Sequence, residues 1–247
     1  MALNIAIALI SALAVHEIIL ALGLSKNYIL LGPSLVFSAA FPFAQEIFFQ
    51  DLSYFLYTVV MFAALIRYHK SITFREVGVI YSMSLLIPTA LTTIVELRSL
   101  GEYHGMFYVI IAIFSAWIAD TGAFAAGSLW GKHKLCPAIS PKKTVEGVVG
   151  AFVLNTAAML VFGLIFDNLF NISHLEISYL ALALVGIGSA VMSILGDLSF
   201  SLIKRSCHIK DFGQVIPGHG GILDRFDSVI FTAPFVYLLF QVLPLLG

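Results

Sequence analysis

The sequence has few charged residues. Asp, Glu, Lys and Arg make up 11% of its 247 positions, against roughly 25% in a typical soluble domain. Apolar residues supply 60% of the chain, and the mean hydropathy is +1.00. This composition excludes an ordinary soluble domain and indicates an integral membrane protein. We expect the lipid bilayer to be its surroundings and expect no nucleic-acid partner.

Cysteine is almost absent, and the histidines are scattered. Cys136 and Cys207 have neither CxxC nor metal-ligand spacing, so we expect both to be free thiols. The seven histidines show no HxxxH or HExxH spacing. We therefore expect no zinc or haem site.

Long apolar runs predict a bundle of membrane-spanning helices. A spanning helix needs about 20 apolar residues, which leaves room for about eight spans in one bundle. Lipid-exposed backbone must pair internally, and runs of this length are helical rather than the short alternating strands of a barrel. The predicted fold class is all-α, with spans at Leu3–Leu22, Tyr28–Phe49, Tyr54–Ile66, Val77–Leu97, Met106–Leu129, Val145–Phe166, Ile177–Ile203 and Phe226–Leu245.

The basic residues predict the orientation of these spans. Of the 13 Lys and Arg residues, all except Arg98 fall in alternate loops of the eight-span arrangement. Basic residues in short loops gather on the cytoplasmic side of a membrane. The two long polar loops, Gly131–Thr144 and Lys204–Arg225, are therefore predicted to face the cytoplasm.

Two carboxylates interrupt the predicted spans that lead into these loops. Asp120 lies a few turns before the first loop, and Asp197 precedes Ser201 and Lys204 on one helical face. Charged residues within spans usually mark a site or a pathway. The alternative is a buried carboxylate that pairs with a lysine for packing alone.

Another pair of carboxylates opens the last predicted span. Asp224 and Asp227 are three residues apart, on one face of that helix. Carboxylates that face each other from two helices are costly unless a cation lies between them. Mg²⁺ prefers a few protein oxygens together with substrate phosphates. The carboxylates therefore indicate a Mg²⁺ site.

The end of the first polar loop, Ser140-Pro141-Lys142-Lys143-Thr144-Val145-Glu146-Gly147, predicts a helix start. Ser140 suits the N-cap and Pro141 the first helical position. Both lysines then fall in the first turn, where the helix dipole favours anions, so the arrangement predicts a phosphate site. Glu146 is expected to pair with Lys142 at i+4. Alternatively, the lysines only set the orientation in the membrane.

The longest polar passage, Ser201–Asp227, combines glycine with charge. Gly218, Gly220 and Gly221 permit close backbone approach, as a loop that holds phosphates requires. His219 is a candidate hydrogen-bond donor to phosphate, and the alternative is a structural histidine in a tight loop. The same passage holds Lys204, Arg205, Lys210, Asp211, Asp224, Arg225 and Asp227.

This passage resembles the signature of the phosphatidate cytidylyltransferases, or CDP-diacylglycerol synthases. Ser201–Arg205, Lys210-Asp211 and Pro217–Asp227 fill that signature without a gap. Asp120–Ala123 and Ser140–Gly147 are similar to further motifs of the family, so the resemblance covers roughly residues 105–240. The first hundred residues resemble the family in hydropathy alone.

The resemblance implies transfer of the cytidylyl group of CTP to phosphatidate, with Mg²⁺ as cofactor, by a homodimer whose active site faces the cytoplasm from the inner (plasma) membrane. The lipid phosphate, with a second pKa of about 6, is largely dianionic near pH 7 and needs no general base. We expect 1–100 to form N-terminal transmembrane helices and 101–247 to form the catalytic region. The chain starts about one helix later than family members, so we expect one N-terminal helix of the family to be missing.

The resemblance also implies roles for the motif residues. Asp197 and Asp224 would hold Mg²⁺, with Asp227 and Asp120 supporting them or binding a second cation. Small residues on the seventh span, such as Gly186, Gly188, Ser189, Ala190 and Gly196, would permit close helix approach beside the lipid entrance. The remaining catalytic assignments are Lys204, Arg205, Lys210 and Arg225. The substrate-binding assignments are Lys142, Lys143, Thr144, Glu146, Ser201, Asp211, Gly218, His219, Gly220 and Gly221.

Three other function classes are alternatives to this one. A CTP-dependent polyprenol or phytol kinase would use an alcohol nucleophile and need a base, and the signature favours the cytidylyltransferase. An ion-coupled transporter would use Asp120 and Asp197 within the membrane, but the sequence has no convincing internal repeat. A purely structural scaffold leaves the dense polar passage unexplained.

Overall fold

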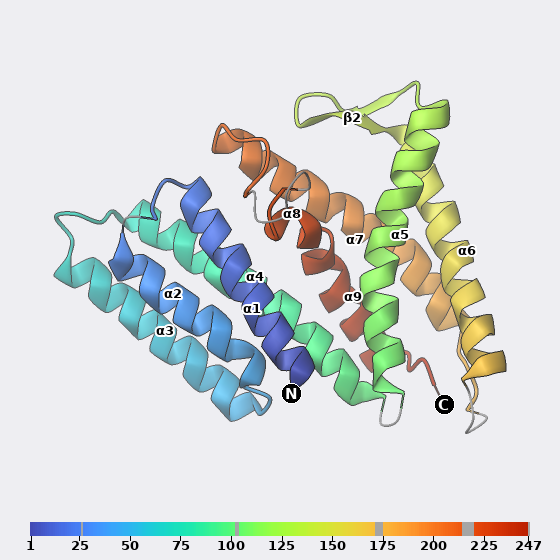
Figure 1. The fold of residues 1–247 in the computed structure, drawn as a ribbon, viewed down its shortest axis with the longest axis horizontal. Helices are drawn as coiled ribbons and strands as arrows, with labels where there is room; N and C mark the ends of the chain where they lie inside the picture. Colours follow the sequence, from blue (N-terminus) through green and yellow to red (C-terminus); the bar gives the residue numbers. More distant parts are fainter. Residues whose placement is uncertain (26, 102–103, 171–174, 214–219, 247) are drawn as a thin grey trace. The chain divides into compact units, whose positions relative to one another are not determined.

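The computed structural model describes residues 1–25, 27–101, 104–170, 175–213 and 220–246 (Figure 1). The chain forms two compact units. Unit 1 comprises Met1–Glu96 and Ser206–Phe226, and unit 2 comprises Leu97–Arg205 and Asp227–Gly247. The predicted site residues Gly218 and His219 lie outside the described residues.

The all-α membrane fold is confirmed. In the described part of the chain, seven helices are long and apolar enough to cross a membrane, and Tyr28–Phe43 is a shorter apolar helical segment. These segments correspond one to one with the predicted spans. Both cysteines are free thiols, as expected.

Unit 1 contains the N-terminal helices and one short helix near its C-terminal end. Figure 1 shows α1, α2 and α3 side by side. The helices, with the α-helices first, are α1 (Ala2–Ala21), α2 (Tyr28–Ala40), α3 (Ile47–Arg67), α4 (Phe74–Leu100, which continues into unit 2), α8 (Leu223–Phe226) and the 3₁₀ helix η1 (Phe41–Phe43).

The predicted boundary between the second and third spans was wrong. We expected the second span to run to Phe49 and the third to be short, whereas α2 ends at Ala40 and α3 has 21 residues. Pro42 lies within η1, where its missing N–H cannot continue the α-helical ladder. The polar pair Gln45-Glu46 lies at this break, with Glu46 as the N-cap of α3, but the predicted second span included it.

Aromatic packing joins α2 and α3 in the core of unit 1. The rings of Phe37 and Tyr57 are stacked at 4.5 Å, and the Tyr57 hydroxyl lies 2.9 Å from the hydroxyl of the fully buried Ser34. In α1, the buried Asn4 amide donates to the Pro42 carbonyl at 3.0 Å. This bond fixes α1 against η1.

Unit 2 contains the long helices that carry most of the predicted motifs. Its apolar core includes Leu97, Ile111, Met159, Leu182 and Val236. The elements are α5 (Gly105–Trp130), β1 (Lys134–Cys136), β2 (Ser140–Thr144), α6 (Val145–Leu169), α7 (Tyr179–Ser206, whose last residue belongs to unit 1) and α9 (Val229–Val242).

Small residues bring the unit 2 helices close together. A Cβ at Gly122 of α5 would lie 2.8 Å from the Gly150 carbonyl of α6, and one at Gly186 of α7 would lie 2.5 Å from the Thr156 Cα. A Cβ at Gly196 would lie 2.6 Å from the carbonyl of Asp227. The expected close approach of the seventh span is confirmed, and at Gly196 it brings α7 against the chain that holds Asp227.

The helix predicted to start at Ser140 starts later. Residues Ser140–Thr144 form strand β2, which pairs antiparallel with β1 in a hairpin between α5 and α6 (Figure 1). Thr144 is the N-cap of α6, and its hydroxyl accepts from the Gly147 N–H at 3.1 Å. Thr144, rather than Ser140, therefore caps the first turn of the helix. Because the helix starts after Thr144, Lys142 and Lys143 lie on strand β2 and not in the first helical turn.

Candidate functional site

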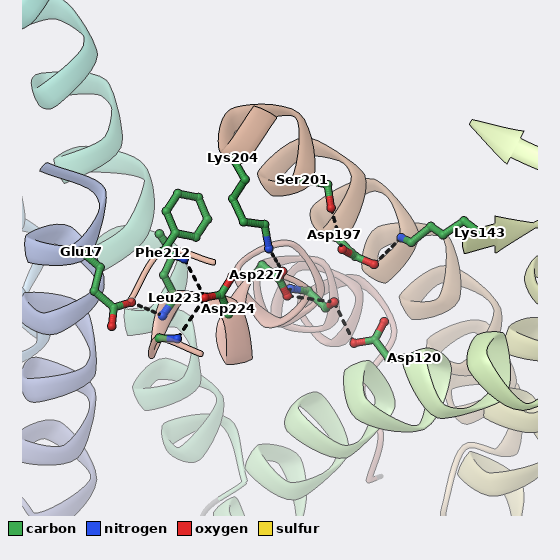
Figure 2. A network of polar contacts seen from close by, with 12 residues as sticks. Glu17, Asp120, Lys143, Asp197, Ser201, Lys204, Phe212, Leu223, Asp224 and Asp227 are labelled. Carbon is green, nitrogen blue, oxygen red and sulfur yellow. Dashed lines mark hydrogen bonds and ion pairs between the residues drawn. The ribbon is translucent and has the colours of Figure 1, made fainter. Parts of the chain in front are cut away.

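A lysine and a carboxylate from two separate motifs meet in unit 2. Lys143 Nζ of β2 lies 2.5 Å from Asp197 Oδ2 of α7 (Figure 2). The Ser201 hydroxyl donates to Asp197 Oδ1 at 3.2 Å, across one turn of the helical face on which the spacing placed both residues. The hairpin therefore places Lys143 beside the helical face of α7 that carries Asp197 and Ser201.

Asp227 and Asp120 form the second part of this network. Lys204 Nζ lies 4.0 Å from Asp227 Oδ2, at the outer limit of an ion pair. The Ser228 hydroxyl lies 2.9 Å from Asp120 Oδ2 and 3.4 Å from Asp227 Oδ1. The Ser193 hydroxyl of α7 donates to Asp120 Oδ1 at 2.5 Å. Hydroxyl groups thus join α5, α7 and the start of α9.

We call Asp120, Lys143, Asp197, Lys204 and Asp227 the unit 2 network. Its three carboxylates act electrostatically on one another, and only two ammonium groups oppose them. Asp227 is 7% exposed, so water screens its charge poorly. When all three carboxylates are ionised, the network carries an excess of negative charge that a cation would relieve.

The network suits a cation that takes part of its ligand shell from substrate. In the described part of the chain, no group of three or more His, Cys, Asp or Glu side chains is arranged to hold a metal ion. A complete protein cage of such ligands is therefore absent there. Mg²⁺ commonly uses one or two carboxylates and completes its shell with water and substrate phosphates, and the excess of carboxylates in unit 2 fits that requirement.

Asp224 has backbone partners in unit 1. Its Oδ2 accepts from the Phe212 N–H at 2.8 Å and from the Gly221 N–H at 3.0 Å (Figure 2). This carboxylate ties together two parts of the loop that precedes α8. Asp224 and Asp227, although three residues apart, therefore contact different groups in different units.

A second carboxylate binds the same loop. Glu17 of α1 accepts from the Ile222 N–H at 2.9 Å and from the Leu223 N–H at 2.8 Å. Sequence reasoning missed Glu17, although it is the only charged residue between Ala2 and Ala21. A lone carboxylate in an apolar span is the signal that identified Asp120 and Asp197, and it applied equally here.

The predicted contact between Glu146 and Lys142 is wrong. Glu146 Oε1 lies 2.7 Å from His133 Nδ1, and the His133 N–H points to the same carboxylate at 3.2–3.3 Å. The reason is the later start of α6: with Lys142 on β2, the two side chains are no longer one helical turn apart. Glu146 instead fastens the start of the hairpin to the start of α6.

The other predicted site residues lie at the ends of elements. Arg205 is exposed in the last turn of α7, and Lys142 is exposed on β2. In unit 1, Gly220 has a φ of +86° and a Cβ there would lie 3.0 Å from Asp224 Oδ2. Lys210, Asp211 and Arg225 are also in unit 1, and all three are exposed.

Comparison with known proteins gives a consistent picture. The profile of the Cytidylyltransferase family matches residues 1–243. The phosphatidate cytidylyltransferase of Bacillus subtilis is 41% identical over 170 residues, which cover 69% of this chain and 60% of that protein. The enzyme of the same name from Staphylococcus saprophyticus is 43% identical over 136 residues, 55% of this chain and 50% of that protein.

A third relative is matched over a longer stretch. The phosphatidate cytidylyltransferase of Haemophilus influenzae is 35% identical over 214 residues, covering 81% of this chain and 73% of that protein. The matched stretch thus amounts to between half and three quarters of the length of these relatives.

Proposed function

Because this chain belongs to the cytidylyltransferase family, we propose that it transfers the cytidylyl group of CTP to phosphatidate, giving CDP-diacylglycerol and pyrophosphate. The observation that carries the proposal is the unit 2 network, in which residues of three motifs meet. The relatives are named for this reaction. The comparisons do not favour the lipid kinase or the transporter.

The proposed reaction is a displacement at the α-phosphorus of CTP. An oxygen of the lipid phosphate forms the new bond to that phosphorus, and the bond from the α-phosphorus to the oxygen that bridges to the β-phosphorus breaks. Pyrophosphate leaves with that bridging oxygen and its electron pair. The attacking phosphate, with a second pKa of about 6, is already largely a dianion near pH 7. The protein therefore has to position two anions and offset their repulsion.

Lys143 and Lys204 are suited to offset that repulsion. Each ammonium group has three donors, so it can keep its carboxylate and still meet a phosphate oxygen. Their side chains are 19% and 12% exposed, so bound phosphates would meet charges that water screens weakly. We assign these two lysines to the phosphates of CTP and of the lipid, with Arg205, Lys210 and Arg225 as further candidates.

The proposal includes Mg²⁺. Asp197 and Asp227 are the carboxylates best placed to hold it, with Asp120 in support, and the assignment of Asp224 as a ligand stays a prediction. When bound, the cation supplies positive charge to the phosphates of CTP and to the departing pyrophosphate. Ser201 and Ser228 orient the carboxylates through their hydroxyl groups.

We also propose where the protein is located and how its chains assemble. The long apolar helices in the described part of the chain support a membrane location, and bacterial relatives support the plasma membrane. The distribution of Lys and Arg supports a site on the cytoplasmic side. We also propose a homodimer, which native mass spectrometry in detergent would detect as twice the 26.9 kDa chain mass.

A direct assay tests the proposed function. Purified protein in detergent is incubated with phosphatidate and each labelled nucleoside triphosphate in turn, with Mg²⁺ or with excess EDTA. We expect CDP-diacylglycerol from CTP alone, and only with Mg²⁺. Folded protein that forms no nucleotide-linked lipid from any triphosphate would overturn the proposal, and lipid alcohols would then be tested as acceptors.

A further inference from the structure

Glu17 is a buried carboxylate in a helix that otherwise has no charged residue. It lies in α1, is 2% exposed, and points toward the loop that precedes α8 (Figure 2). Burying a carboxylate is costly unless hydrogen bonds compensate for the lost water. Here the compensation comes from the backbone, through the Ile222 and Leu223 N–H groups.

Those two N–H groups need an acceptor from outside α8. The first N–H groups of a helix have no partner within it, and α8 spans only Leu223–Phe226. Asp224 accepts the N–H groups of Phe212 and Gly221. We call Glu17 and Asp224 the clasp. Together they accept four backbone N–H groups at the described ends of the loop between α7 and α8. The donors are Phe212, Gly221, Ile222 and Leu223.

Two glycines of the loop leave room for Glu17. A Cβ at Gly221 would lie 2.4 Å from Glu17 Oε2, and a Cβ at Gly213 would lie 2.5 Å from Glu17 Oε1. Neither glycine has the positive φ that Gly220 has, so their backbone conformations are open to other residues. Contact with the Glu17 carboxylate, rather than backbone conformation, therefore accounts for glycine at both positions.

We propose that Glu17 is a positioning residue for the transfer reaction. With Asp224, it holds the described ends of the loop, at Phe212 and at 221–223, in a fixed arrangement, so that the neighbouring charged residues Lys210, Asp211 and Arg225 are positioned for substrate. Glu17 acts through the backbone and does not touch the reacting atoms. This inference rests on the proposed function for its effect on activity, but the clasp itself can be tested without activity.

Graded substitutions at Glu17 test the role. Glu17→Ala removes both acceptors, and misplacing catalytic groups by about 1 Å costs on the order of 100-fold in rate. We expect that loss in kcat/KM per folded molecule. Glu17→Gln keeps one acceptor oxygen, so we expect an intermediate loss. Equal activity of Glu17→Ala and wild type would overturn the proposal.

Hydrogen exchange provides a readout that does not depend on catalysis. We expect the backbone amides of 220–226 to exchange faster in Glu17→Ala than in wild type, measured by mass spectrometry on protein in detergent. Asn4→Ala is the matched control, because it removes a buried hydrogen bond from the same helix at the Pro42 carbonyl. It should lower stability while leaving kcat/KM and exchange at 220–226 unchanged.

A double-mutant cycle separates positioning from general destabilisation. Gly221→Ala should lower activity in the wild-type background, because the new methyl group meets Glu17. In the Glu17→Ala background the same change should cost little, since the obstructing carboxylate is gone. Additive losses would overturn the proposed contact. If wild type forms no CDP-diacylglycerol, the proposed function fails, and unchanged exchange at 220–226 would separately refute the clasp.

Discussion

Close lysine ammonium groups accompany the carboxylates of unit 2, whereas the contacts described for the carboxylates of unit 1 are to the backbone. In unit 1, Glu17 and Asp224 accept from backbone N–H groups. In unit 2, Asp197 pairs with the Lys143 ammonium group at 2.5 Å, and Asp227 lies 4.0 Å from that of Lys204 while also accepting the Ser228 N–H at 2.7 Å. Backbone donors are fixed by the chain, whereas a lysine can turn from a carboxylate to a phosphate. The first arrangement stabilises a loop, and the second is suited to binding and releasing charged substrates.

The contrast is sharpest between two neighbours in sequence. Asp224 and Asp227 belong to the same signature, yet Asp224 ties the loop of unit 1 and Asp227 belongs to the network of unit 2. Removing either carboxylate should therefore impair the protein for different reasons. Substitutions in the unit 2 network should therefore reduce activity most, and substitutions that act on backbone geometry should reduce stability.

Asp197→Asn should cause the largest loss of activity. The substitution leaves Lys143 without its anionic partner and removes a charge assigned to Mg²⁺, and loss of one preorganised electrostatic group costs on the order of 100- to 1,000-fold in kcat. Cytidylyl transfer measures the loss. The matched control is Asp51→Asn, which removes an exposed carboxylate in α3 and should leave kcat at the wild-type value. Equal effects of the two substitutions would contradict the assignment.

Lys143→Met should cause the second largest loss of activity, about 100-fold in kcat/KM for CTP. The substitution keeps most of the side-chain volume and removes the ammonium group that pairs with Asp197. Lys134→Met, on the other strand of the hairpin and exposed, is the matched control and should have no effect. A wild-type kcat/KM in Lys143→Met would show that Lys143 serves packing alone.

Gly220→Ala should affect stability through the backbone. Its φ of +86° lies in the left-handed region, which costs other residues roughly 1–2 kcal/mol. The matched control is Gly78→Ala in α4, where a new methyl group meets nothing within 4 Å. Gly78→Ala should raise the free energy of unfolding by about 0.5–1 kcal/mol, because it removes a glycine from within a helix. Denaturant unfolding in mixed micelles measures both, and shifts of the same sign would refute the backbone explanation.

Thr144→Ala should have the smallest effect, about 1 kcal/mol of stability, because it removes the N-cap of α6. The same unfolding experiment measures it. Ser128→Ala removes an exposed hydroxyl within α5 and should be close to neutral. A large fall in kcat without loss of stability would instead support substrate binding by Thr144.

The sequence predicted the helices well but not where neighbouring helices divide. Apolar length and the spacing of polar residues placed α5 and α7, together with the contact between Asp197 and Ser201. The end of α2 was misplaced although Pro42 and the polar pair Gln45-Glu46 mark the break, because the residues on both sides of them are apolar. It also misplaced the start of α6, since Ser140-Pro141 and Thr144 both suit a helix N-terminus and only the hairpin decides between them.

The site was predictable as a set of motifs and not as a set of contacts. The signature identified Asp197, Asp224 and Asp227, but spacing could not show that the last two belong to different units. Glu17 lies about two hundred residues from its partners, Ile222 and Leu223. A lone acidic residue in an apolar span predicts a function but not its partner. The division of the chain into 1–100 and 101–247 stays a prediction.

The central claim is that the lipid phosphate itself attacks the α-phosphorus of CTP. Phosphatidate labelled with ¹⁸O at the terminal oxygens of its phosphate tests this most directly, with both products analysed by mass spectrometry. We expect all of the label to be retained in CDP-diacylglycerol and none to appear in pyrophosphate. Label in pyrophosphate, or formation of CDP with a pyrophosphorylated lipid, would contradict it.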